Sequence, residues 1–356
     1  MGLFGLFKKD KEHKHKGFHD LSVSSLHKLT SETVQVTFDV PEELRKAFVY
    51  QPGQHLEVII PIGGKEERRS YSICSETNEP LSFAVKSVEN GLVSKWFNEE
   101  LKAGMQLTVS EPKGSFVLPS DAKNIVAVAA GSGITPIMAM AKAIETHGGN
   151  MRLFYGNRTR TSIIFKSVLD GLKNTFTTHF LSAEDAEGFE KGRIDKDTFT
   201  QLLKSDLSLL RADAYFLCGP EEMIIATVDV LNFFGVPEKK IHFELFTPPV
   251  LMKQEKESPN TFSGISHVKV ILDGDVTQLD LSAKGKTILE AVEAAGLDAP
   301  YSCKGGVCSS CRAKVLIGNA VMTNNYSLTD EEVKKGYILT CQAHPATEEL
   351  TVSYDD

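Results

Sequence analysis

Four cysteines near the end of the chain have the spacing of a metal-ligand set. Cys303, Cys308 and Cys311 lie in the stretch YSCKGGVCSSC, and Cys341 follows after residues 312–340. Four thiolates at C-x4-C-x2-C…C are typical of plant-type [2Fe–2S] clusters. Zinc also accepts four cysteines, although its sites usually supply two C-x2-C pairs. The spacing predicts a [2Fe–2S] cluster, and a structural zinc site is the alternative.

A cluster of this kind implies two further sites elsewhere in the chain. A two-iron cluster carries one electron at a time, whereas a nicotinamide delivers two electrons as a hydride. A flavin accepts a hydride and releases single electrons, so it is the expected intermediate between them. We therefore expect a flavin site and a nicotinamide site upstream of the cysteines.

The stretch RRSYSIC, residues 68–74, is the candidate flavin site. Alternation along a strand puts Arg69 and Tyr71 on one face. A guanidinium can grip a diphosphate with two hydrogen bonds, an aromatic face can cover an isoalloxazine ring, and the Ser72 hydroxyl can hydrogen-bond flavin N5. The alternative is an ordinary strand with an exposed arginine and a half-buried tyrosine.

Two glycine-containing stretches are candidates for the nicotinamide site. Gly131 and Gly133 belong to GSGITP, which follows an apolar strand and opens a helix, where a backbone can approach a pyrophosphate. Cys218 and Gly219 belong to CGP, which also ends a predicted parallel strand. Ligands of open α/β sheets bind along that edge. The alternative for Cys218 is a buried free thiol that packs as an apolar residue.

The elements that must position these residues fall into three segments. Residues 17–119 contain short, closely spaced strands, which predict an antiparallel sandwich or barrel. Residues 120–247 alternate strands with helices, including a helix at 162–173, and predict a parallel sheet. Residues 248–264 form an expected linker. Residues 265–356 contain a hairpin with its turn near Asp273–Gly274 and then the four cysteines.

The overall composition restricts the class of protein. The 356 residues carry a net charge of −8, which argues against nucleic acid as the main partner. No run of about 18 apolar residues exists, so stable membrane insertion is not expected. Cysteines without an export signal indicate a reducing, cytoplasmic setting. Residues 1–16 are expected to be a disordered basic tail, with a weak membrane-surface anchor as the alternative.

Taken in order, the motifs R-x-Y-S, G-x-x-S, GSGITP, CGP and the cysteine set resemble the ferredoxin–NADP⁺ reductase superfamily with a C-terminal plant-type ferredoxin domain. The resemblance implies an antiparallel β-barrel that binds FAD, an α/β parallel-sheet nucleotide domain and a β-grasp [2Fe–2S] domain, although FMN stays open. It implies flavin contacts from Arg69, Tyr71 and Ser72. It assigns further cofactor contacts to Gly91, Val93, Ser94, Gly131, Gly133, Thr135, Cys218, Gly219 and Phe246. It assigns the reacting groups to Tyr71, Ser72, Cys218 and Glu244.

Several shorter stretches narrow this resemblance. AAGSGITP, YGNRT, GRID, CKGGVC and TNNYSL are similar to the reductase subunits of bacterial phenylacetyl-CoA epoxidases. That similarity implies an oxygenase component, a diiron protein complex, as the electron acceptor. Reductases of ring-hydroxylating dioxygenases, desaturases or other diiron systems share the same modules and stay open. A zinc-binding module joined to a flavin dehydrogenase is an alternative of a different class.

The choice of nicotinamide depends on the end of the second strand of the nucleotide segment. An acidic residue there favours the ribose 2′-hydroxyl of NADH, whereas arginine suits the 2′-phosphate of NADPH. The sequence has Arg158 and Arg160 there, and Lys191 and Arg193 in a later stretch. NADPH is the expected substrate, with NADH as the alternative and solvated surface charges as the simpler interpretation.

Overall fold

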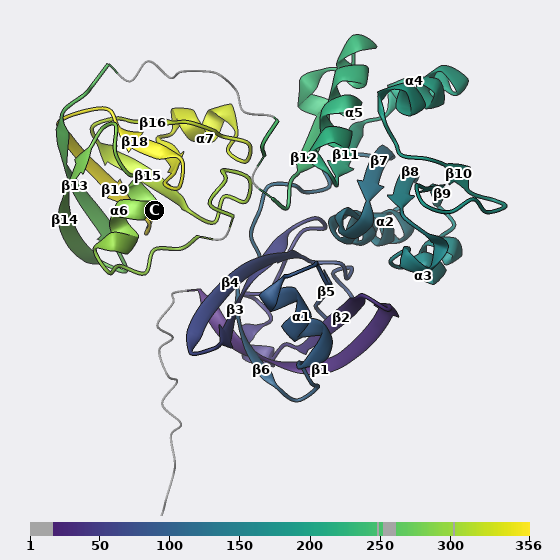
Figure 1. Ribbon diagram of the computed structural model, residues 1–356, viewed down its shortest axis with the longest axis horizontal. Coiled ribbons are helices and arrows are strands. Elements are labelled where there is room, and N and C mark those ends of the chain that lie inside the picture. Colours follow the sequence, from purple (N-terminus) through teal and green to yellow (C-terminus); the bar gives the residue numbers. More distant parts are fainter. Residues whose placement is uncertain (1–16, 248, 252–260, 302) are drawn as a thin grey trace, which may run out of the picture.

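The computed structural model describes residues 17–247, 249–251, 261–301 and 303–356. Figure 1 shows three bodies in chain order: a curved sheet, a sheet flanked by helices, and a small C-terminal sheet domain. The expected N-terminal tail and most of the expected linker lie outside the described residues.

The first body is an antiparallel barrel. Its six-stranded sheet has the order β4-β3-β6-β1-β2-β5, and a bridge between Ile73 and Phe83 joins its two edges. Leu56, Val58 and Ile60 alternate along one strand and fill the interior. This confirms the predicted barrel. The elements are β1 (Phe18–Thr30), β2 (Thr33–Asp39), β3 (His55–Ile62), β4 (Lys65–Ser72), β5 (Ser82–Lys86), α1 (Leu92–Glu99) and β6 (Gln106–Ser110).

The second body is a six-stranded sheet of order β10-β9-β8-β7-β11-β12 in which every pair is parallel. The central strand NIVAVAA is apolar on both faces because helices cover both sides, α2 and α3 on one and α4 and α5 on the other. The strands are β7 (Asn124–Ala130), β8 (Asn150–Asn157), β9 (Thr175–Leu181), β10 (Glu190–Lys191), β11 (Ala214–Cys218) and β12 (Ile241–Glu244). The helices are α2 (Ile134–His147), α3 (Lys166–Gly171), α4 (Lys196–Ser205) and α5 (Glu221–Phe233).

One predicted helix of this body is wrong in its first turn. The apolar spacing of residues 162–173 predicts a single helix, but α3 begins only at Lys166. Ile163, Ile164 and Phe165 are buried in the core instead, and Phe165 has φ 62°, which no helix can continue through. Tertiary burial of these three side chains outweighs their helical spacing.

The third body is a five-stranded sheet of order β14-β13-β19-β15-β17 with a short two-stranded sheet beside it. The hairpin turn lies at Asp273 and Gly274, as predicted, and both have positive φ. The cysteine loop precedes β15, and Cys341 follows β17. The elements are β13 (Ile265–Leu272), β14 (Asp275–Ser282), α6 (Ile288–Ala294), β15 (Arg312–Ile317), β16 (Ala320–Met322), α7 (Asp330–Lys334), β17 (Tyr337–Leu339), β18 (Ala343–Pro345) and β19 (Glu349–Ser353).

Candidate functional site

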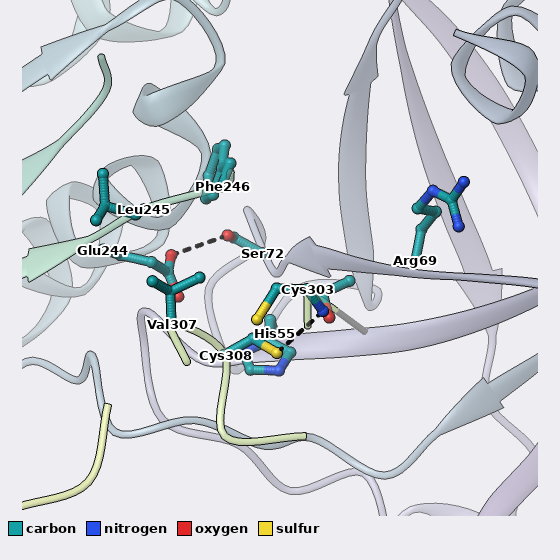
Figure 2. A pocket seen from close by; sticks show the side chains of 10 residues that line it. His55, Arg69, Ser72, Glu244, Leu245, Phe246, Cys303, Val307 and Cys308 are labelled. Carbon is teal, nitrogen blue, oxygen red and sulfur yellow. Dashed lines mark hydrogen bonds between the residues drawn. The ribbon is translucent and has the colours of Figure 1, made fainter. Parts of the chain in front are cut away.

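The three bodies meet around a cavity of about 240 Å³. Figure 2 shows the side chains that line it: the barrel supplies one wall, the end of β12 a second, and the cysteine loop a third. Its polar and sulfur-bearing wall residues include His55, Ser72, Glu244, Cys303 and Cys308. A flavin site and a cluster site would therefore face each other across one small space.

Ser72 and Glu244 form a polar pair in this cavity. The Ser72 hydroxyl at the end of β4 donates to Oε2 of Glu244 at the end of β12, at 3.3 Å. Burial raises the pKa of the Glu244 carboxyl to about 8, and the hydrogen bond from Ser72 opposes that rise. The carboxyl consequently holds its proton at neutral pH.

Cys218 is the neighbour of this pair within the parallel sheet. It pairs with Glu244 in the register of β11 and β12, and it is fully buried. Burial raises the pKa of its thiol well above the usual range, and the nearby Glu244 charge adds to that rise. Cys218 is therefore a neutral thiol beside the Ser72–Glu244 pair and is not a thiolate nucleophile.

The remaining members of the R-x-Y-S stretch are held by barrel contacts. The Tyr71 ring stacks on Phe83 with centroids 4.9 Å apart and meets Phe97 edge-on at 5.2 Å. Arg69 lies at the cavity wall, where it ion-pairs with Glu67 at 3.0 Å. Figure 2 shows its guanidinium turned away from Ser72 and Glu244. The Arg69 and Ser72 side chains thus point to different regions of the site. This separation is expected if Arg69 contacts the flavin diphosphate and Ser72 contacts the flavin ring.

The stretch ENGLVS forms the turn that opens α1. The Ser94 hydroxyl accepts a hydrogen bond from the Val88 amide and donates to the Gly91 carbonyl. A Cβ on Gly91 would lie 2.4 Å from a Val88 methyl carbon and 2.5 Å from the Ser94 oxygen, so a side chain does not fit there. Val93 is buried in the barrel core. The turn therefore leaves backbone N–H groups without a covering side chain at the start of α1, and a diphosphate can bind to such groups.

A second and larger pocket, of about 570 Å³, opens at the C-terminal edge of the parallel sheet. A Cβ on Gly133 would lie 2.1 Å from the Cys218 carbonyl oxygen, so only glycine lets the start of α2 approach β11 this closely. Phe246, which is 45% exposed, lines both this pocket and the smaller cavity. Of the residues predicted from sequence, this pocket gathers Gly131, Gly133, Arg158, Arg193, Gly219 and Phe246.

Three predicted nucleotide contacts lie outside this pocket wall, and one of them is the fully buried Cys218. The Thr135 hydroxyl is buried and donates to the Ser132 carbonyl at 3.0 Å, so it shapes the glycine turn from inside. Arg160 lies outside the pocket wall, where its side chain binds the Glu184 carboxylate at 2.6 Å. Of the two neighbouring arginines, Arg158 is the one that faces the pocket.

The four cluster cysteines are drawn together as two pairs. The Cys303 backbone amide donates to the Cys308 sulfur at 3.4 Å, and the Cys311 and Cys341 thiols lie close enough for each to shift the pKa of the other. The Gly305 amide donates to the Cys303 sulfur at 3.3 Å, which is the kind of contact that stabilises charge on a ligating thiolate. Cys303 and Cys308 on one side and Cys311 and Cys341 on the other give two pairs of thiols, an arrangement that fits two irons with two thiolates each.

His55 is a site residue that the sequence did not reveal. It lies directly across from Ser72 in the register of β3 and β4, and it is 3% exposed. Burial lowers the pKa of its imidazole to about 4, so the ring is neutral. Its Nε2 is buried and finds no hydrogen-bond partner in the described residues, which leaves a polar atom for a bound group to satisfy. Only the strand register brings it to the cavity.

Comparison with protein-family models finds three matches in chain order. An oxidoreductase FAD-binding domain matches residues 20–118, an oxidoreductase NAD-binding domain matches 127–229, and a 2Fe-2S iron-sulfur cluster binding domain matches 270–346. These matches agree with the two pockets and the paired cysteines described above.

Comparison with whole proteins extends the match over almost the entire chain. One subunit of the 1,2-phenylacetyl-CoA epoxidase of Escherichia coli (strain K12) is 38% identical over 350 residues, which cover 95% of this chain and 98% of the relative. The chain belongs to the ferredoxin–NADP⁺ reductase superfamily. It is an oxidoreductase of the branch that carries a C-terminal [2Fe–2S] ferredoxin domain, as its motifs predicted.

Two other members of this superfamily show how widely the arrangement is used. The ferredoxin reductase component of a 3-ketosteroid-9-alpha-monooxygenase from Rhodococcus rhodochrous is 33% identical, covering 94% of this chain and 96% of the relative. A solved structure of phthalate dioxygenase reductase is 25% identical, with a TM-score of 0.59, covering 95% of this chain and 98% of that one. The modules are thus shared by relatives whose names carry different substrates.

The helices in the described residues have at most 14 residues. Among those in the described residues, none combines the length and apolar character needed to cross a membrane.

Proposed function

We propose that this reductase carries electrons from NADPH through FAD and a [2Fe–2S] cluster to the oxygenase component of a phenylacetyl-CoA epoxidase. The observation that carries the electron path is the shared cavity, in which Ser72 and Glu244 on one side face Cys303 and Cys308 on the other. The domains would span 17–119 for FAD, 120–247 for the nucleotide and 265–356 for the cluster, joined by 248–264.

On the flavin side, the protein's part is binding and proton placement. Bound FAD would supply the conversion of a hydride into two single electrons. Arg69 and the turn at Gly91 and Ser94 would hold its diphosphate, and Tyr71 would cover the ring. The Ser72 hydroxyl and the protonated Glu244 carboxyl would hold a proton beside the reacting edge of the ring.

On the nucleotide side, glycine backbone and arginine charge would select the substrate. The close approach at Gly133 and Gly219 would admit the pyrophosphate, with the buried Cys218 thiol beneath the nicotinamide path. Arg158 and Arg193 line the pocket and would bind the 2′-phosphate of NADPH, which is why we favour NADPH over NADH. Phe246 lies between the two cavities, so a nicotinamide that reaches the flavin would have to pass it.

On the cluster side, Cys303, Cys308, Cys311 and Cys341 would ligate the irons. The cluster, when bound, would supply a one-electron carrier. The terminal acceptor would be the oxygenase component of an enzyme that acts on phenylacetyl-CoA, as the name of the 38% identical relative suggests, and we expect that component to be a diiron complex. Monooxygenases of other substrates are the competing partners, because 3-ketosteroid-9-alpha-monooxygenase and glycine betaine monooxygenase reductases match at 33% and 30% identity.

Two measurements test this proposal in sequence. Protein isolated without oxygen and reduced with dithionite should give the rhombic paramagnetic resonance signal of a [2Fe–2S] centre, contain acid-labile sulfide and release FAD on heating. Mixed with NADPH, a diiron epoxidase and phenylacetyl-CoA, it should oxidise NADPH only when the thioester is present. A yellow protein without labile sulfide would contradict the electron path. Coupling to a steroid or an aromatic acid instead would contradict only the named partner.

A further inference from the structure

Arg68, the residue before Arg69, is buried between the barrel and the ferredoxin domain. Its side chain is only 8% exposed. The guanidinium carbon lies 5.2 Å from the centroid of Phe18, at the start of β1, and 5.8 Å from that of Tyr301 in the ferredoxin domain. Its Nη2 lies 3.8 Å from Oδ1 of Asp298 in the same domain. Arg68 therefore contacts both bodies at once.

The strand geometry separates Arg68 from Arg69 and Tyr71, two of the three predicted flavin contacts. Along β4, alternate side chains point to opposite faces, so Arg68 shares a face with Ser72 and not with Arg69 and Tyr71. Ser72 lines the cavity, whereas Arg68 is not one of its lining residues and lies beside Asp298 and Tyr301, just before the cysteine loop. Arg68 therefore serves the contact between domains and does not line the cavity.

The chemistry of this contact is specific to arginine. A planar guanidinium can lie against aromatic faces and still bind a carboxylate, which an ammonium cannot do as well. A cation withdrawn from water also requires a counter-charge, and Asp298 supplies one from the opposite domain. Asp298 is 43% exposed, so the pair can separate and become hydrated when the domains part.

The position of the anchored segment makes the contact relevant to the cluster. Tyr301 lies two residues before the ligand Cys303, so a contact at Asp298 and Tyr301 restrains the entry to the cysteine loop. Within the loop, Val307 is buried in a cluster of apolar side chains that contains Leu245 of the nucleotide segment. The loop is therefore held at its entry and at Val307 against the cavity that Ser72 and Glu244 share.

We propose that Arg68 is a positioning residue that holds the ferredoxin domain in its electron-receiving arrangement through Asp298 and Tyr301. The inference rests on the proposed electron path. It adds a residue that controls one step of that path, the transfer of electrons from the flavin to the cluster. Arg68 does not touch the reacting atoms; it sets how often the cysteine loop lies against the flavin side of the cavity. Release of the pair would free the domain for its external acceptor.

The test separates the two internal steps in the holoprotein. Arg68→Met keeps an unbranched side chain of similar length without the charge, and Asp298→Asn removes the counter-charge from the exposed partner. In anaerobic rapid mixing with NADPH, flavin reduction should keep its wild-type rate in both. The later reduction of the cluster should slow about fivefold in each, the scale expected for loss of one partly exposed ion pair. Combining Arg68→Glu with Asp298→Arg should restore most of that rate.

Two controls keep the result specific. Arg45→Met removes an arginine of the same barrel that also pairs at 3.8 Å, with Glu42, but lies outside the ferredoxin contact, so both steps should stay at wild-type rates. Added salt should slow cluster reduction in the wild type more than in Arg68→Met, because only the wild type has the Arg68–Asp298 ion pair for salt to screen. If Arg68→Met fails to fold or to retain FAD, Asp298→Asn decides.

Cluster-reduction rates within about twofold of wild type in Asp298→Asn, with no recovery in the charge-exchanged double variant, would overturn the assignment. That result is distinguishable from failure of the proposed function. A wild-type protein without the cluster signal, or without flavin reduction by either nicotinamide, would remove the electron path itself.

Discussion

The Ser72 hydroxyl donates a hydrogen bond to Glu244 although 172 residues separate them in the chain. One belongs to the last position of β4 in the barrel and the other to the last position of β12 in the parallel sheet. Their contact joins the two cofactor-binding bodies, and it creates a buried carboxyl whose pKa is raised to about 8. The pair therefore marks where the two bodies pack together and places a titrating carboxyl at the shared cavity.

The first prediction concerns the pH dependence of flavin reduction. In the wild type, the rate of NADPH-driven ferricyanide reduction should fall as pH rises through about 8, because the Glu244 carboxyl then loses its proton. Glu244→Gln mimics the neutral carboxyl and should remove this limb from the pH profile. Ser72→Ala removes the hydrogen bond that opposes the raised pKa, so the limb should move to higher pH. A limb that persists unchanged in Glu244→Gln would contradict the assignment.

The same carboxyl gives a second prediction, for stability. The folded state retains the Glu244 proton up to about pH 8, whereas the unfolded chain releases it near the ordinary value of 4.5. The folded state thus binds more protons in this window, and the free energy of unfolding should decrease as pH rises through it. Urea unfolding of wild type and Glu244→Gln at several pH values measures this. The variant should show a shallower decline, and equal slopes would argue against a buried, neutral Glu244.

A third prediction separates two neighbouring arginines. Arg158 lines the nucleotide pocket, whereas Arg160 is ion-paired to Glu184 outside its wall. Arg158→Ala should lower kcat/KM for NADPH by about tenfold, because a charged hydrogen-bond partner of the 2′-phosphate is lost, and should leave NADH largely unaffected. Arg160→Ala is the matched control and should leave the ratio of the two unchanged. A ratio that moves only in Arg160→Ala would reverse this interpretation.

A fourth prediction concerns Gly133. A Cβ at this position would lie 2.1 Å from the Cys218 carbonyl oxygen, and backbone on both sides would have to shift. Gly133→Ala should therefore destabilise the protein by about 1–3 kcal/mol and weaken NADPH binding. Gly171→Ala, in α3 with nothing within 4 Å of the added carbon, should leave stability unchanged or raise it by up to about 1 kcal/mol. Thermal unfolding of both variants measures the contrast, and a neutral Gly133→Ala would contradict the close packing.

A fifth prediction distinguishes the cluster cysteines from the isolated ones. Cys303→Ser should abolish or strongly alter the reduced-cluster resonance signal and lower labile sulfide, while flavin reduction by NADPH persists. Cys74 is equally free of disulfides but is buried in the core and hydrogen-bonded to Ser82, far from the cluster loop in sequence. Cys74→Ala should keep full sulfide content and an unchanged signal. Loss of sulfide in both variants would point to general unfolding.

The sequence by itself determined the features that depend on local spacing. The C-x4-C-x2-C…C pattern, the R-x-Y-S strand and the GSGITP turn each predict a short-range geometry from residues that are close together in the chain. Alternating and continuous apolar runs determined which segments form a barrel and which a parallel sheet, because their periods differ. The family, the three bodies and the cysteine set could therefore be predicted before any contact was known.

Only the tertiary structure decided which residues share a space. The register of β3 and β4 places His55 opposite Ser72, and packing of the domains brings Glu244 to that pair. Glu184 draws Arg160 away from the pocket that Arg158 faces. Burial of residues 163–165 delays the start of a helix that their spacing predicted. Each outcome depends on atoms distant in the chain, whose combined packing free energy exceeds the local preferences that a sequence pattern records.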